Sequence, residues 1–132
     1  MLTILKHPVF LVSLGGALGA NARYWLGVWI KSREWSEHFP LGTFLANVSG
    51  CLVLAFLAMT FLDRMTPTNR LWFLFLGTGF CGAYTTFSTF EVETWNLIQD
   101  GRWPLALFYV VSSVLAGFVA VVVGASIAKS VT

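Results

Sequence analysis

Charge is scarce in this sequence. Only 11% of its 132 residues are charged, while 57% are hydrophobic, and an ordinary soluble domain has about 25% charged residues. A soluble fold of this size leaves much of its surface in water whatever its packing, so it could not hide this much apolar area. The shortage of charge therefore excludes an ordinary soluble domain and predicts an integral membrane protein.

Other shortages exclude classes of function. The net charge is only +2 and the basic residues are scattered singly, so no patch could neutralise the phosphates of a nucleic acid. The two cysteines, Cys51 and Cys81, lie inside apolar segments, which favours small buried thiols over a disulfide or a metal site. No nucleophile–base pair stands out and no His/Cys cluster has ligand spacing, so we expect neither an enzyme nor a transition-metal centre.

Long apolar segments, in contrast, are abundant. Each of four is long enough to cross a hydrocarbon core of about 30 Å as a helix. We predict an all-α membrane protein with a single transmembrane domain over residues 1–132 and spans at about 9–30, 41–62, 70–98 and 104–127. Small residues at a spacing of four predict close helix packing on three spans, at Gly15 and Gly19, at Gly42, Ala46 and Gly50, and at Ser113, Ala116, Gly117, Ala120 and Gly124.

The third span differs from the others. Leu71 to Phe80 predicts a regular helix, but Gly79 and Gly82 are poor interior helix residues and Tyr84 to Thr86 favour extended backbone. We therefore predict a helix that is broken in the middle of the membrane, between Gly82 and Thr86. Such backbone survives only where it is buried in protein or lines a cavity, and its carbonyls can coordinate a cation. The alternative is a kink whose hydroxyls bond back to the chain.

Polar side chains within the spans are the candidates for function. Asn47 is the only strongly polar side chain of the second span, with Thr43 one turn earlier on the same face. A polar group in lipid is costly unless it has a partner, so Asn47 either binds a ligand or joins two helices. Four hydroxyls gather in the third span, at Thr85, Thr86, Ser88 and Thr89, which favours an ion site or pathway there. Tyr109, Ser112 and Ser113 form a polar stripe on the fourth span that either lines a pore or holds helices together.

The basic residues are balanced between the two ends of the predicted bundle. One end has four, and the other has four if Arg23 is counted with it, or three if not: Lys6, Arg64, Arg70 and Lys129 against Arg23, Lys31, Arg33 and Arg102. Orientation in the membrane normally follows an excess of Lys and Arg on the cytoplasmic side. A chain without this excess can insert both ways, so we predict that two oppositely inserted copies pair as an antiparallel dimer.

Three motifs resemble the small fluoride channels of the Fluc or CrcB family, and the resemblance covers essentially the whole chain. The first motif is Gly15 to Ala20 followed by Arg23-Tyr24, and the second is Gly42-Thr43 with Asn47 and Gly50. The third and most specific is the twelve-residue string Gly79-Phe80-Cys81-Gly82-Ala83-Tyr84-Thr85-Thr86-Phe87-Ser88-Thr89-Phe90.

The resemblance implies an antiparallel, dual-topology homodimer in the bacterial inner membrane, with two pores that export fluoride passively from the cytoplasm and so lower its toxicity. It further implies a role for individual residues. Phe87 and Phe90, with the hydroxyls of Ser88 and Thr89, would line the pore, and Asn47, near Thr43, would donate a hydrogen bond to the ion. Tyr109 and Ser113 would form a polar track, and Arg23 would draw anions into a vestibule.

The resemblance also implies that the carbonyls of Gly82 and Thr85 would hold a structural Na⁺ at the dimer centre. Glu91 departs from the family pattern, which has a small residue after Phe90.

Two other functions stay open on the residues alone. A small dual-topology, proton-coupled exporter of cationic compounds needs a carboxylate inside the membrane. The first span has none, so protonation of Glu93, just after the predicted break, would have to be coupled to transport. The chain could also be a membrane assembly subunit that transports nothing.

Overall fold

The computed structural model describes residues 7–33, 38–62 and 66–131. Lys6 and Arg64, which enter the predicted charge balance, lie outside the described residues. Within them the chain is helical, with no strand, and the prediction of an all-α membrane protein is confirmed there. The helical elements are α2 (Pro8–Ser32), α3 (Leu41–Leu62), α4 (Pro67–Trp72), the π-helix η1 (Phe73–Cys81), α5 (Gly82–Tyr84), α6 (Phe87–Gln99) and α7 (Trp103–Val131).

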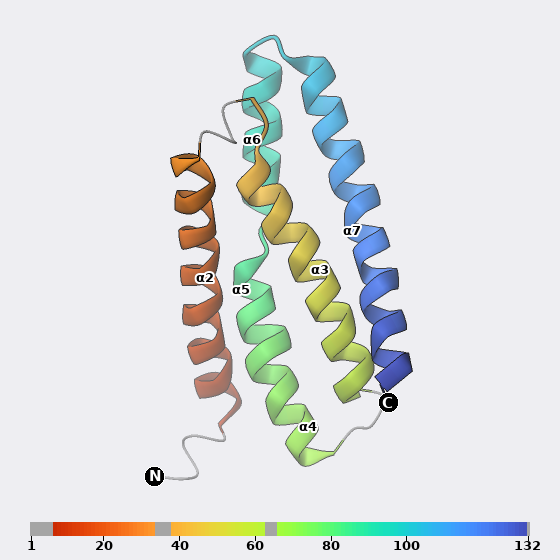
Figure 1. The fold of residues 1–132 in the computed structure, drawn as a ribbon. Helices are drawn as coiled ribbons and strands as arrows, with labels where there is room; N and C mark the ends of the chain where they lie inside the picture. The colour runs from red at the N-terminus through yellow and green to blue at the C-terminus, as the bar shows by residue number, and fades with distance from the viewer. Residues whose placement is uncertain (1–6, 34–37, 63–65, 132) are drawn as a thin grey trace.

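The elements form four long helical segments, the third of which consists of α4, η1, α5 and α6 (Figure 1). Proline begins two elements, Pro8 in α2 and Pro67 in α4, where its missing N–H costs no helical hydrogen bond. The side chain of Thr66 caps α4 by accepting from the Asn69 N–H. Gly101, with φ +72°, makes the turn between α6 and α7, a left-handed conformation that glycine adopts at little cost.

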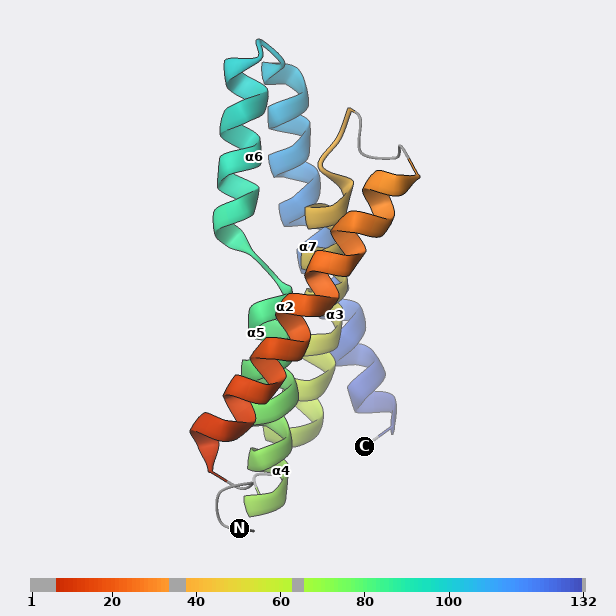
Figure 2. The same cartoon turned by 90° about the vertical axis from the view of Figure 1, so that its left-hand side faces the viewer.

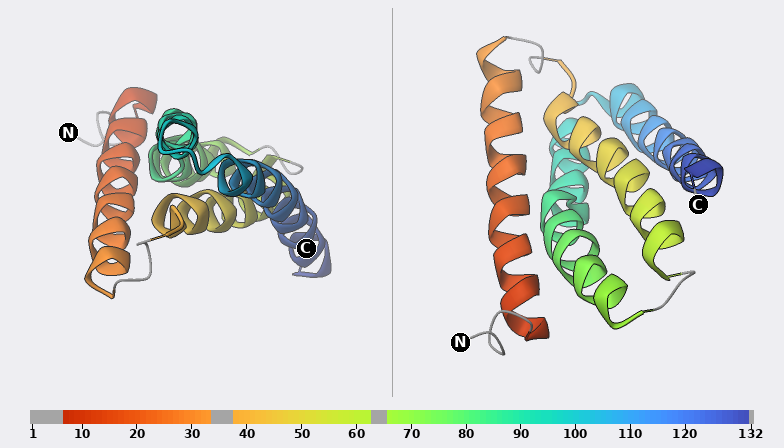
Figure 3. Two further views of the ribbon diagram at one scale, coloured as in Figure 1. Left: turned by 90° about the horizontal axis from the view of Figure 1, so that it is seen from above. Right: turned by 60° about the horizontal axis from the view of Figure 1, so that its bottom comes forward.

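Contacts in the bundle are strongest between α3 and α7 and between α2 and η1. Figure 1 shows α2 and α7 on opposite sides of α3, and Figure 2 shows α6 leaving the direction of α5 after the break. Seen along the bundle, α6 and the start of α7 lie next to each other, and the carboxyl end of α7 diverges from α2 (Figure 3). The third segment therefore contacts two different helices. Its first part, η1 and α5, packs on α2, and its second part, α6, packs on α7.

Glycines let the backbones of α2 and η1 pack closely against each other, as is common in membrane proteins. A Cβ at Gly15 would meet the Phe75 carbonyl, and a Cβ at Gly19 would meet the Phe80 carbonyl. A Cβ at Gly124 of α7 would likewise meet the Leu52 carbonyl of α3. The small residues predicted from their spacing thus lie where two backbones come closest.

The prediction of a regular helix over Leu71 to Phe80 is wrong, because Phe73 to Cys81 form a π-helix. Its wider turns place the ring of Phe73 beside Gly77, where a Cβ would lie 2.8 Å from the ring, and place Gly79 against the backbone of α2. The large side chain of Phe73 thus fits beside Gly77 in the same helix. Turns of π-helix are frequent near functional sites.

Apolar side chains cover the outside of the bundle. In α3 and α7 the most apolar 18-residue windows have mean hydropathies of 2.1 and 2.5, and only 17% of each window is buried. The core helix of a soluble protein of such hydropathy would be mostly buried, whereas lipid accepts an apolar exterior. Two helices within the described residues are thus long and apolar enough to cross a membrane, in agreement with the predicted membrane protein.

Candidate functional site

The break in the third segment lies at Thr85 and Thr86. Both residues are extended, with φ −83° and ψ 159° at Thr85 and φ −153° and ψ 119° at Thr86. The predicted break between Gly82 and Thr86 is confirmed at its carboxyl end, because Gly82 to Tyr84 still form a helical turn. Thr86 then caps α6: its Oγ1 accepts from the Thr89 N–H at 3.3 Å and donates to the Thr89 hydroxyl at 3.0 Å.

Asn47 of α3 binds the backbone of the break. Its Oδ1 accepts from the Thr86 N–H at 2.7 Å, and its Nδ2 donates to the Thr86 carbonyl at 3.0 Å. The Asn47 amide thus bonds both backbone groups of Thr86, in the way that a residue of a neighbouring β-strand would. It supplies hydrogen bonds to an N–H and a carbonyl at the break in the helix. Of the two roles open for Asn47, the structure contains the helix–helix contact, and one amide hydrogen remains for a ligand.

Two carbonyls at the break lose their normal helical donors. The Thr86 N–H, four residues after Gly82, donates to Asn47, and the Thr89 N–H, four residues after Thr85, donates to the Thr86 hydroxyl. The Ala83 carbonyl between them accepts from Nε of Arg23 at 3.2 Å. The carbonyls of Gly82 and Thr85 are therefore among the acceptors that the break releases from the helical ladder.

A carboxylate joins three elements beside the break. Oε1 of Glu93 on α6 accepts from the Thr43 hydroxyl of α3 at 2.8 Å, and Oε2 accepts from the Tyr109 hydroxyl of α7 at 2.8 Å. From the sequence, Glu93 is a candidate only for an exporter, and its hydrogen bonds with Thr43 and Tyr109 were not predicted. The available signal was its position one turn beyond Phe90, at a spacing of three.

The two phenylalanines of the third segment have different surroundings. Phe90 is only 8% exposed, and its ring centroid lies 5.0 Å from that of Tyr109. Phe87 is 74% exposed, and its centroid lies 6.0 Å from that of Phe90. Phe90 thus connects the Tyr109–Glu93 cluster to Phe87, whose ring faces the outside of the single chain.

The remaining predicted hydroxyls are not all part of this cluster. Ser88 is exposed and Thr89 is half-buried against Thr86. On α7, Ser112 donates to the Tyr109 carbonyl at 3.3 Å. The hydroxyl of Ser113 is buried without a hydrogen-bond partner among the described residues, so it remains available to a ligand.

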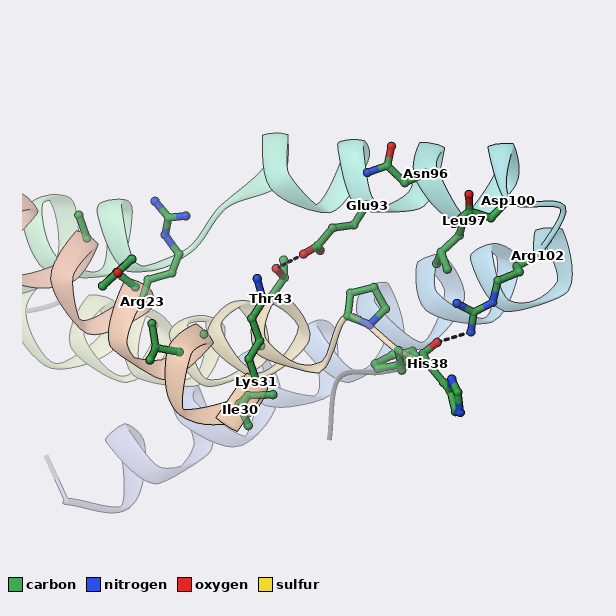
Figure 4. A pocket seen from close by; sticks show the side chains of 17 residues that line it. Arg23, Ile30, Lys31, His38, Thr43, Glu93, Asn96, Leu97, Asp100 and Arg102 are labelled. Atoms are coloured by element: carbon green, nitrogen blue, oxygen red, sulfur yellow. Dashed lines mark hydrogen bonds between the residues drawn. The ribbon is translucent and has the colours of Figure 1, made fainter. Parts of the chain in front are cut away.

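An open cavity of about 550 Å³ lies between α2, α3 and α6 and reaches residues 38–40 and Arg102 at the end of the bundle. Figure 4 shows Arg23 toward the break, Thr43 and Glu93 in the middle, and His38 and Arg102 at the far end. The cavity is lined by both signs of charge, at Arg23, Lys31, Glu93, Asp100 and Arg102. Arg23, predicted in a vestibule, lies in this cavity, where its long side chain places a cation close to the break.

The fold and this site define a small all-α membrane protein built around a broken helix with a polar cavity beside the break. Residues 10–125 match the family described as CrcB-like protein, Camphor Resistance (CrcB). The chain belongs to this family.

Relatives named "Fluoride-specific ion channel FluC" align over most of the chain. The relative from Acidobacterium capsulatum is 50% identical over 113 residues, which cover 86% of this chain and 89% of the relative. The relative from Oceanobacillus iheyensis is 43% identical over 120 residues, covering 91% and 90%. A relative from Rhodococcus jostii, "Fluoride-specific ion channel FluC 2", is 47% identical over 116 residues, covering 88% and 94%.

Proposed function

We propose that this protein is a fluoride-specific ion channel that exports fluoride passively across the bacterial inner membrane and so lowers its toxicity. The observation that carries the proposal is the polar cluster of Thr43, Glu93 and Tyr109, which lies beside Phe90 and the broken helix inside an apolar bundle. The names of the aligned relatives specify fluoride as the ion.

Hydrogen-bond donors suit fluoride, which is small and strongly hydrated. The hydroxyls of Thr43 and Tyr109 are ordered by Glu93, and a fluoride ion replaces the carboxylate as their acceptor when it passes. The unpartnered hydroxyl of Ser113 and the second amide hydrogen of Asn47 extend the donors along the path. The positive edges of Phe87 and Phe90 add weak contacts, which let an ion enter without trapping it.

The proposed working unit is an antiparallel, dual-topology homodimer with two pores. Its support is the balance of basic residues between the two ends and the apolar surface next to the break, where Phe87 is 74% exposed. A ring so exposed cannot enclose a pore within one chain, whereas a second copy would cover it.

A structural Na⁺ at the centre of this dimer is the proposed ligand of the Gly82 and Thr85 carbonyls. The donor set fits the ion, because both oxygens are neutral and lack their helical donors, and carbonyls of unwound helices coordinate sodium. Gly82 is exposed, and a Cβ there would meet no atom within 4 Å. An ion bound there would tie the break of one copy to that of the other.

Neither alternative function is favoured. Glu93 does lie in a cavity, as a proton-coupled exporter requires, but both its oxygens accept hydrogen bonds from Thr43 and Tyr109. An assembly subunit without transport has no use for the polar cluster inside the bundle.

Fluoride efflux from liposomes tests the proposal. Purified protein is reconstituted into fluoride-loaded liposomes, and external fluoride is followed with a fluoride electrode. We expect rapid efflux once a potassium ionophore balances the charge, and little efflux from liposomes without protein. Efflux no faster than from empty liposomes would refute the function, and coupled movement of protons with an organic cation would favour the exporter.

A further inference from the structure

Residues 38–40 line the cavity, immediately before α3, and form hydrogen bonds at both ends of the segment. Nη2 of Arg102, just before α7, donates to the His38 carbonyl at 2.7 Å (Figure 4). The Phe39 carbonyl accepts from the Leu41 N–H at 2.7 Å, at the start of α3. A short segment is thereby tied to two helices that are far apart in the sequence, and the ring of Phe39 has little freedom to move.

The ring of Phe39 packs edge to face on three other rings. Its centroid lies 5.6 Å from Phe44 at an interplanar angle of 70°, 6.0 Å from Phe108 at 61°, and 5.2 Å from Tyr109 at 83°. Edge-to-face packing is the preferred geometry for aromatic pairs and adds to the free energy of simple burial. The contact with Tyr109 is the shortest of the three.

Tyr109 is therefore held between two phenylalanines. It is 0% exposed, with Phe39 at 5.2 Å and Phe90 at 5.0 Å. The χ2 angle of a tyrosine is broad when no neighbour restricts it, and its hydroxyl reaches Oε2 of Glu93 at 2.8 Å only with the ring in a suitable orientation. Phe90 contacts the ring from the side of the break, and Phe39 supports it from the side of the cavity mouth.

We propose that Phe39 is a positioning residue of the ion path, which holds the Tyr109 ring so that its hydroxyl points at Glu93 and is ordered for fluoride. Arg102 supports this role because it anchors the backbone next to Phe39. Neither residue touches the ion; both act through Tyr109. The inference rests on the proposed function in one respect: the rate of fluoride efflux is used to detect the position of the Tyr109 hydroxyl.

The test compares Phe39→Leu, which removes the ring, with Phe39→Tyr, which keeps it. We expect Phe39→Leu to lower the initial rate of fluoride efflux about fivefold, the effect of losing the edge-to-face pair with Tyr109, and Phe39→Tyr to retain most of the rate. Phe61→Leu is the matched control, because Phe61 is also half-buried but lies at the other end of α3. Its rate should equal that of the unaltered protein.

A double-mutant cycle separates positioning from general damage to the fold. In a Tyr109→Phe background the hydroxyl is already gone, so Phe39→Leu should lower efflux no further, since residues that act as a unit are not additive. Arg102→Gln gives the same comparison without altering a ring, should Phe39→Leu fail to fold, and Arg102→Lys should restore part of the rate. Equal losses in both backgrounds, or a normal rate in Phe39→Leu, would overturn the inference alone. An unaltered protein that passes no fluoride would overturn the proposed function and the inference together.

Discussion

Phe87 and Phe90 share one helical face by sequence but have different roles in packing. Phe90 is buried next to Tyr109, whereas Phe87 is 74% exposed in the single chain. Spacing alone places both rings on one face of α6. It could not show that one ring completes the core of its own chain while the other lacks a neighbour.

Replacing either ring by isoleucine should slow fluoride efflux from liposomes. Isoleucine keeps most of the apolar volume but has no positive ring edge to meet an anion. We expect Phe90→Ile and Phe87→Ile each to lower the rate about tenfold, equivalent to ~1.4 kcal/mol of barrier, while the elution volume on size-exclusion chromatography stays that of the unaltered protein.

Phe118→Ile is the control for these two variants, because Phe118 is 68% exposed on α7. Its efflux should match that of the unaltered protein. Normal efflux in both Phe87→Ile and Phe90→Ile would remove the rings from the mechanism.

The hydrogen-bond partners of Glu93 could not be predicted from single residues. Asn47 and Thr43 were recognisable because polar side chains are rare in the apolar second span. Glu93 lies in a more polar segment, where a carboxylate is equally compatible with a solvated surface. Its hydrogen bonds come from Thr43, fifty residues earlier, and from Tyr109, sixteen residues later. Pairings over such distances depend on the fold and carry no local signature.

At the scale of elements, the helices and the break were predictable and the π-helix was not. The apolar segments, with Pro8 just before the first, identify α2, α3, the third segment and α7 to within a few residues. Gly82 and the threonines after it indicate the break. The π-helix over Phe73–Cys81 lies where Gly15 and Gly19 pack closely on its backbone, a tertiary contact that the sequence of η1 alone does not reveal.

Removal of sodium should act on the break. If the carbonyls of Gly82 and Thr85 hold Na⁺, exchange for N-methyl-D-glucamine during purification should lower both the thermal stability of the protein and its fluoride efflux. A ligand at about 100 times its Kd stabilises the folded state by ~2.7 kcal/mol, and loss of that amount is visible as a lower melting temperature.

Returning sodium, in comparison with returning the same concentration of lithium or potassium, checks that the effect belongs to this ion and not to ionic strength. Recovery with sodium alone is the expected result. Equal melting temperature and full efflux in the large organic cation would contradict the sodium site.

At the scale of the whole molecule, the basic residues lie at opposite ends of the bundle. Arg70 in α4 and Lys129 near the end of α7 lie at the end shown at the bottom of Figure 1. Lys31, at the end of α2, and Arg102, just before α7, lie at the other. Over the whole sequence the two predicted ends have four basic residues each, or four against three if Arg23 is not counted, so neither has the excess that would select one orientation. The exposed Phe87 gives an oppositely inserted copy a surface to cover.

Forcing one orientation should therefore inactivate the protein, and a complementary copy should restore it. Ser32 and Gln99 are exposed near one end, and Thr68 and Ser130 near the other. Ser32→Lys with Gln99→Lys adds two positive charges to the first end, and Thr68→Lys with Ser130→Lys adds two to the second.

Expressed alone, each biased protein should give little fluoride resistance in cells that lack their own exporter, because all copies insert the same way. Co-expression should restore resistance, since each copy then meets an opposite one. Asparagine at the same four positions changes the side chains without the charge and should leave resistance intact. A lysine-biased protein that confers full resistance alone would show that opposite insertion is not required, and the two halves of the pore would then have to come from copies that face the same way.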